Sequence, residues 1–184
     1  LPEDEPALAR YIKLENEQPT SEFIVHLGDI VTGRRKDWEE AQYKKIAGLL
    51  RDGNRLPTFV VPGDNEWNDM DNPDAAWKMW TNNFLHFDQQ WKFTVPVVRQ
   101  PERMENFAFV LREVLFLGLN KVGGRVHDEV ADGKVGVVQD DILHFPDHAV
   151  PRVHQKAQQA ACGTPLTARL IVAFAHFGAD TGQA

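Results

Sequence analysis

The 184-residue sequence has one cysteine, Cys162, and no long hydrophobic run. A single cysteine excludes an internal disulfide and any zinc site built mainly from cysteines. No apolar stretch approaches the roughly 20 residues that a membrane-spanning helix needs, so we expect no membrane span. Basic residues are also outnumbered, with 20 lysines and arginines against 27 acidic residues and a formal net charge of −7. This balance disfavours a nucleic-acid groove, whose affinity depends on basic patches.

The composition and the spacing of apolar residues predict a soluble, single α/β domain over residues 1–184. Hydrophobic residues make up 42% of the chain, enough for a sizeable core. Short apolar runs predict buried strands at 23–27, 57–61 and 170–175, and an antiparallel hairpin of 106–111 with 114–119. Helices are predicted at 37–51 and from Asn72 to Trp91, whereas residues 7–14 are expected to be either a short helix or disordered. Residues 129–168 are expected to be a diverged or inserted segment.

The third predicted helix carries large aromatic residues at alternating steps of three and four. Such a stripe is either an aromatic platform for a ligand or one side of a helix that faces the core. The regular helical spacing favours the core. The residues of the stripe are Trp77, Trp80, Phe84, Phe87 and Trp91.

Three predicted strands end in residues that can bind metal ions. The first ends in Gly28-Asp29, the second in Gly63-Asp64-Asn65-Glu66, and the last in His176. If these strands are neighbours in one sheet, their polar ends gather at one edge. Two carboxylates and an imidazole can then form a divalent metal site, although each alone is more often a turn, a cap or a structural histidine.

These motifs resemble those of the calcineurin-like metallophosphoesterases. Gly28-Asp29 matches the family's second motif block, and His176 matches its fourth. Residues 62–69, Pro-Gly-Asp-Asn-Glu-Trp-Asn-Asp, match the third block in its Gly-Asp-Asn-Glu-Trp variant, and residues 99–107 and 118–124 are also similar to that subgroup. The resemblance implies an α/β/β/α sandwich with two divalent metals. It also implies hydrolysis of a phosphomonoester or phosphodiester by a metal-bound hydroxide.

The resemblance implies a role for each matching residue. Asp29 would bridge two metal ions, and Asp64 and His176 would bind one of them. Asn65 stands where the family has an acid histidine; an amide cannot donate a proton as an acid at neutral pH, but it can orient phosphate. Glu66 would hold Asn65 in place. Oxygen and nitrogen ligands without cysteine suit Mn, Fe, Zn or Mg.

Two motif blocks of the family, Asp-x-His and Gly-His-x-His, are absent from these residues. Because the chain also begins at Leu1 rather than Met, we expect a fragment whose sandwich is incomplete at both ends. The expected partner is a phosphate-ester substrate. The alternative is a non-catalytic phosphoesterase-like module that binds a metal or a partner without turnover.

The remaining histidines and one asparagine are weaker candidates. His26 alternates along a predicted strand and is expected to be structural. Asn120 follows a predicted strand end and is a candidate neighbour of the site on geometry alone. His127 could reach the site. His144, His148 and His154 have a spacing that fits neither a helix face nor a tight turn.

Overall fold

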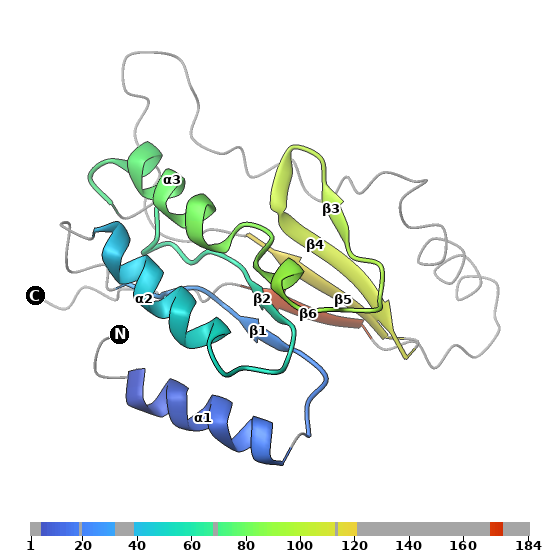
Figure 1. Ribbon diagram of the computed structural model, residues 1–184. Helices are drawn as coiled ribbons and strands as arrows, with labels where there is room; N and C mark the ends of the chain where they lie inside the picture. The colour runs from blue at the N-terminus through green and yellow to red at the C-terminus, as the bar shows by residue number, and fades with distance from the viewer. Residues whose placement is uncertain are drawn as a thin grey trace, which may run out of the picture.

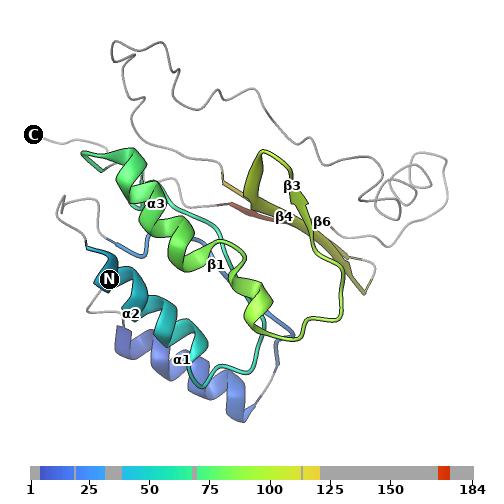
Figure 2. The ribbon, with the colours of Figure 1, turned by 45° about the horizontal axis from the view of Figure 1, so that its top comes forward.

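The computed structural model describes residues 5–18, 20–31, 39–67, 70–112, 114–120 and 170–174. Within them, helices lie on one side of a two-stranded sheet, and a four-stranded sheet lies on its other side (Figures 1 and 2). The helical segments are α1 (Glu5–Glu17), α2 (Glu40–Arg51), α3 (Pro73–Phe84) and the 3₁₀ helix η2 (Phe87–Gln90). The strands are β1 (Ile24–His26), β2 (Thr58–Val60), β3 (Val98–Gln100), β4 (Arg103–Leu111), β5 (Val114–Leu119) and β6 (Leu170–Phe174).

The first sheet is a parallel pair, in which His26 of β1 is in register with Val60 of β2. In the second sheet the order is β3-β4-β5-β6, with antiparallel pairs except for parallel β5 and β6. The predicted hairpin is therefore confirmed as β4 and β5. The single-sheet hypothesis required the last strand, β6, to be a neighbour of β1 and β2. Instead, β6 pairs with β5 in the second sheet.

Local sequence explains where α2 and α3 begin and end. Glu39 and Gln42 form a reciprocal capping box at the start of α2. The side chain of Asn72 caps α3 by accepting the Ala75 N–H at 3.1 Å, and Pro73 occupies the first helical position. The prediction that this helix continues to Trp91 is wrong. The chain leaves the α-helix after Phe84 and resumes as η2.

The core has two parts, one on each face of the β1–β2 sheet. The helices bury Tyr43, Leu50 and most of the aromatic stripe, of which Trp80, Phe84 and Phe87 are at most 3% exposed. The core orientation predicted for the stripe is therefore confirmed. Between the two sheets, phenylalanines pack edge-to-face, tilted or stacked, with ring centroids 4.7–6.5 Å apart. This second cluster contains Phe23, Phe59, Phe93, Phe107, Phe109 and Phe116.

The ring contacts also indicate the direction of β5 relative to β1. Phe23, just before β1, contacts Phe116 of β5 at 4.9 Å. Phe59 lies level with the middle of β1 and contacts Phe107, which is in register with Gly118 of β5. A step along β1 is thus matched by a step along β5 in the same direction. The carboxyl ends of β1, β2 and β5 lie at the same end of the sandwich.

Candidate functional site

The loops that follow β1 and β2 touch each other. Gly28 has a φ of +83°, and a Cβ atom there would lie 2.0 Å from the Gly63 nitrogen. A Cβ atom on Gly63 would lie 2.2 Å from Oδ1 of Asp29. Both distances are far inside van der Waals contact, so only glycine fits at either position. The carboxylate of Asp29 therefore lies directly against the loop that carries Asp64.

Asp29 adopts a left-handed backbone conformation, with a φ of +55°. This region is uncommon for residues other than glycine, and aspartate is among those that tolerate it best. Such conformations persist only where the surrounding structure enforces them, and they concentrate at functional sites. The backbone of Asp29 and the two following residues is held in this way by a carboxylate from the second loop.

That carboxylate belongs to Glu66, and it accepts four backbone hydrogen bonds. Its Oε2 accepts the N–H of Gly63 at 2.6 Å and of Asp29 at 2.9 Å. Its Oε1 accepts the N–H of Ile30 and, at 3.2 Å, of Val31. Each oxygen therefore serves two amides, and one side chain joins the loop after β1 to the loop after β2.

The surroundings of Glu66 are those of a positioning residue. The residue is 0% exposed, and burial raises its pKa to about 7 although hydrogen bonds from Gly63 and the other amides lower it. The hydroxyl of Tyr43 in α2 donates to the Glu66 carbonyl at 3.2 Å, and burial together with Glu66 raises the pKa of Tyr43. Glu66 thus ties both loops to each other and to the helical layer.

Asp64 and Asn65 lie in the turn that Glu66 anchors. Asp64 is 8% exposed, and its carbonyl accepts the N–H of Trp67 at 3.3 Å, which closes the turn. Asn65 is half-buried. The four sequence-predicted residues Asp29, Asp64, Asn65 and Glu66 therefore come together on two touching loops.

His176 lies outside the described residues, as do residues 129–168 and the four histidines between β5 and β6. Among the residues that the structure describes, no three His, Cys, Asp or Glu side chains form a group that could hold a metal ion. Carboxylate oxygens are nevertheless the ligands that divalent cations prefer. Asp29 and Asp64 are the carboxylates that the two touching loops could offer as such oxygen ligands, because Gly63 allows Asp29 to approach the loop that carries Asp64.

His26 has a structural contact, as its position in the sequence predicts. Its Nδ1 accepts the N–H of Gly28 at 3.2 Å. Burial lowers the pKa of His26 to about 4, so the imidazole is neutral at pH 7 and remains an acceptor. His26 therefore supports the turn that brings Asp29 to the second loop.

Sequence reasoning missed a cluster of buried polar side chains in the four-stranded sheet. The cluster lies at the end of the sandwich that also holds the two touching loops. It comprises Gln100, Glu105, Asn106 and Asn120, of which only Asn120 is named above. A signal was present, because Glu105 and Asn106 stand directly before an apolar stretch within the same strand. Two polar residues at the start of a buried strand require partners.

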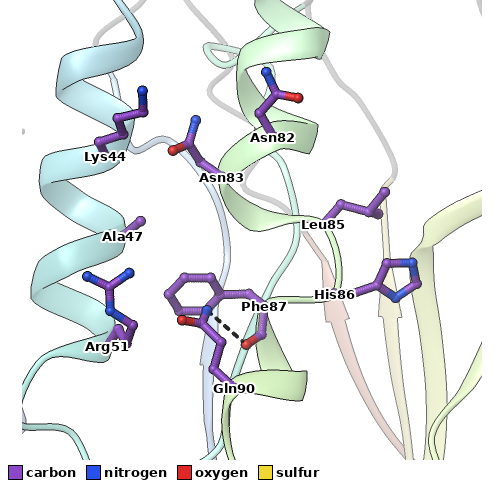
Figure 3. A pocket seen from close by; sticks show the side chains of 9 residues that line it. All are labelled: Lys44, Ala47, Arg51, Asn82, Asn83, Leu85, His86, Phe87 and Gln90. Carbon is purple, nitrogen blue, oxygen red and sulfur yellow. Dashed lines mark hydrogen bonds between the residues drawn. The ribbon is translucent and has the colours of Figure 1, made fainter.

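A cavity of about 540 Å³ lies elsewhere, between α2 and the segment formed by α3 and η2 (Figure 3). Its two cations are already paired, Lys44 with Glu40 at 3.5 Å and Arg51 with Asp52 at 2.8 Å. The lining contains none of the predicted site residues: it consists of Lys44, Ala47, Arg51, Asn82, Asn83, Leu85, His86, Phe87 and Gln90.

Comparison with known proteins bears on the two touching loops. The family model for calcineurin-like phosphoesterases matches residues 3–155, which is most of the chain. The chain belongs to the calcineurin-like phosphoesterase family. The match covers both loops and ends before His176. Neither the curated proteins nor the solved structures yielded a match.

Family membership accounts for the observed fold and suggests phosphoester hydrolysis as the general reaction. The helices and two sheets agree with the α/β metallophosphoesterase fold. Members of the family act on phosphoesters and usually bind divalent metals. Among the described residues, no helix combines the length and apolar character that crossing a membrane requires.

Proposed function

We propose that this chain carries the site of a metal-dependent phosphoester hydrolase, in which Asp29, Asp64 and His176 bind divalent cations. The observation that supports it most directly is the contact between the two loops, which places the carboxylate of Asp29 against the loop of Asp64. Both loops follow parallel strands, where α/β sheets commonly bind their ligands. The metal is Mn, Fe, Zn or Mg on the chemistry of its ligands.

Each of the chain's own residues has a distinct task in this proposal. Divalent cations in such sites lower the pKa of bound water and neutralise phosphoryl oxygens. Asp29 and Asp64 would supply the negative charge that holds the cations, with Asp29 as the ligand that two of them would share. Asn65, half-buried in the same turn, donates a hydrogen bond to a phosphoryl oxygen. Glu66 keeps both loops in place through its four amide contacts.

The alternative is a non-catalytic module that binds a metal or a partner. Asn65 favours it, because the family has an acid histidine at this position and an amide cannot protonate a leaving group. The retained carboxylates, Asp29 and Asp64, favour the enzyme. Turnover is what distinguishes the two.

The test measures Mn²⁺ and Zn²⁺ affinity of the purified chain by calorimetry, with Asp64→Ala beside it. We expect stoichiometric binding that Asp64→Ala weakens by at least about 10-fold, since even residues that only support a metal ligand contribute this much. Asp74→Ala is the matched control, because Asp74 is exposed in the first turn of α3. Equal affinity of wild type and Asp64→Ala would refute the site.

Hydrolysis of a generic aryl phosphate by the same samples then separates the two functions. Metal-dependent turnover that Asp64→Ala lowers and Asp74→Ala preserves supports the hydrolase. Stoichiometric metal binding without turnover supports the non-catalytic module instead.

A further inference from the structure

The site end of the four-stranded sheet is polar where the rest of the sheet interior is apolar. Gln100 at the end of β3, Glu105 and Asn106 in β4, and Asn120 directly after β5 are all buried. The next residues of β4, from 107 to 109, are buried phenylalanine and alanine. Buried polar groups cost free energy unless they are hydrogen-bonded, so this cluster is unusual beside such a core.

The cluster converges on Asn120. Its N–H donates to Oδ1 of Asn106 at 2.6 Å, and its carbonyl accepts Nη2 of Arg103 at 3.2 Å. Its side-chain Nδ2 donates to Oε1 of Glu105 at 3.1 Å, and Arg103 donates to the same oxygen at 2.7 Å. Asn106 is held in turn by Gln100, at 2.8 Å. Both the backbone and the amide group of Asn120 are thereby fixed.

One atom of this arrangement, Oδ1 of Asn120, is buried, and none of the described residues donates a hydrogen bond to it. Turning the amide over would place Oδ1 against the carboxylate of Glu105, where two acceptors would repel each other. The orientation is therefore set by Glu105, and Oδ1 is an acceptor held in place before any ligand binds. A buried polar atom of this kind requires an explanation, and a bound ligand or an ordered water supplies one.

Resting on the proposed function, we propose that Asn120 is a positioning residue whose Oδ1 accepts a hydrogen bond from an O–H group bound at the site. Asn120 follows β5, at the same end of the sandwich as the touching loops of Gly28 and Gly63. A carbonyl oxygen only accepts, so ionised phosphoryl oxygens do not suit it. The donor is a hydroxyl in the alcohol part of the ester, or an ordered water between the ester and Asn120.

The test compares two substrates that differ only in hydroxyl groups, glycerol phosphate and propyl phosphate, with Mn²⁺ present. A single neutral hydrogen bond corresponds to a roughly 3- to 10-fold change, so Asn120→Ala should lower kcat/KM by about this factor. If the donor is a substrate hydroxyl, kcat/KM falls only for glycerol phosphate. If the donor is water, kcat/KM falls equally for both substrates. Unchanged kcat/KM for both overturns the inference.

Binding without turnover gives a second readout. Butyl phosphonate and its 3,4-dihydroxy derivative imitate the two substrates and cannot be hydrolysed, so calorimetry reports their affinity alone. We expect the same roughly 3- to 10-fold weakening in Asn120→Ala, with the same dependence on the hydroxyls. Asn120→Ser is the second variant if alanine does not fold. Unfolding of both variants would show a purely structural residue and overturn the inference.

Asn54 provides the matched control at the opposite end of β2. It is 7% exposed, and its side chain is fully bonded, to the Leu50 carbonyl and Thr58 Oγ1 at 2.8 Å each and to the Leu56 N–H at 3.0 Å. Asn54→Ala should reduce stability but leave phosphonate affinity unchanged. Equal weakening in Asn54→Ala and Asn120→Ala would contradict a positioning role. A wild-type chain that binds no Mn²⁺ and hydrolyses neither ester would instead refute the proposed function itself.

Discussion

Replacing Glu66 by glutamine should destabilise the fold, although the two side chains have almost the same shape. Each carboxylate oxygen accepts two backbone N–H groups, those of Gly63 and Asp29 on Oε2 and those of Ile30 and Val31 on Oε1. In Glu66→Gln one oxygen becomes an NH₂ group. Whichever way the amide turns, two buried N–H donors then face another donor.

The magnitude follows from the two donors that lose their acceptor. A buried donor left without a partner costs about 1–3 kcal/mol, so the pair corresponds to roughly 2–6 kcal/mol. The neutral amide is easier to bury than a carboxylate, which offsets part of this. We therefore expect the free energy of unfolding to fall by about 3 kcal/mol, and Tm to fall by about 6–12 °C for a domain of this size.

Urea unfolding monitored by tryptophan fluorescence measures this change, and hydrogen exchange locates it. The amides of Asp29, Ile30, Val31 and Gly63 should lose protection before the rest of the β1–β2 sheet. Glu17→Gln is the control, because the Glu17 side chain is 57% exposed and forms an exposed ion pair with Lys13 at 3.8 Å; it should change stability by less than about 0.5 kcal/mol. A Glu66→Gln variant as stable as Glu17→Gln would refute the reasoning.

Two further predictions concern the same end of the first sheet. Gly63→Ala should lower the free energy of unfolding by about 1–3 kcal/mol and weaken Mn²⁺ binding, because the new Cβ would overlap Asp29. Gly48→Ala in α2 is the control: its Cβ would meet nothing closer than 3.6 Å, so it should raise the free energy of unfolding by about 0.5–1 kcal/mol in the same urea assay. Because the pKa of His26 is lowered to about 4 from 6.5, the folded state resists protonation, so its contribution is complete above pH 6.5 and is lost as the pH falls toward 4. The loss should reach up to about 2 kcal/mol at pH 5, seen as the difference between wild-type and His26→Gln unfolding curves; parallel pH dependences would contradict it.

The periodicity of apolar residues predicted which helices and strands form better than it predicted where they end or which strands pair. The helix expected to reach Trp91 ends at Phe84, because Leu85 is extended and His86 then takes a left-handed φ of +59°. No glycine or proline in the sequence indicates this break. The aromatic spacing continues through η2 because that segment packs on the same core. The three-residue strand β3 escaped notice for lack of length, and nothing in β6 itself indicates which sheet it joins.

The candidate site shows the same division between local and long-range information. Glycine and aspartate after a buried strand are visible in the sequence, so Asp29 and Asp64 were predicted as candidates. The contacts of Glu66 were not, because its amide partners at 29–31 lie 35 to 37 residues away. Likewise, the orientation of the Asn120 amide depends on Arg103, Glu105 and Asn106 around it, a three-dimensional arrangement that strand alternation does not encode.

The carboxylate of Glu66 also determines when, during synthesis on the ribosome, the loop after β1 can adopt its final conformation. Glu66 follows Asp29 by 37 residues, so at ordinary translation rates it is added about 2 to 7 s later. Throughout that interval the amides of residues 29–31 have no carboxylate to bind, and the Gly63 loop against which Gly28 packs does not yet exist. The first half of the site is thus made early but takes its shape only when the second half emerges.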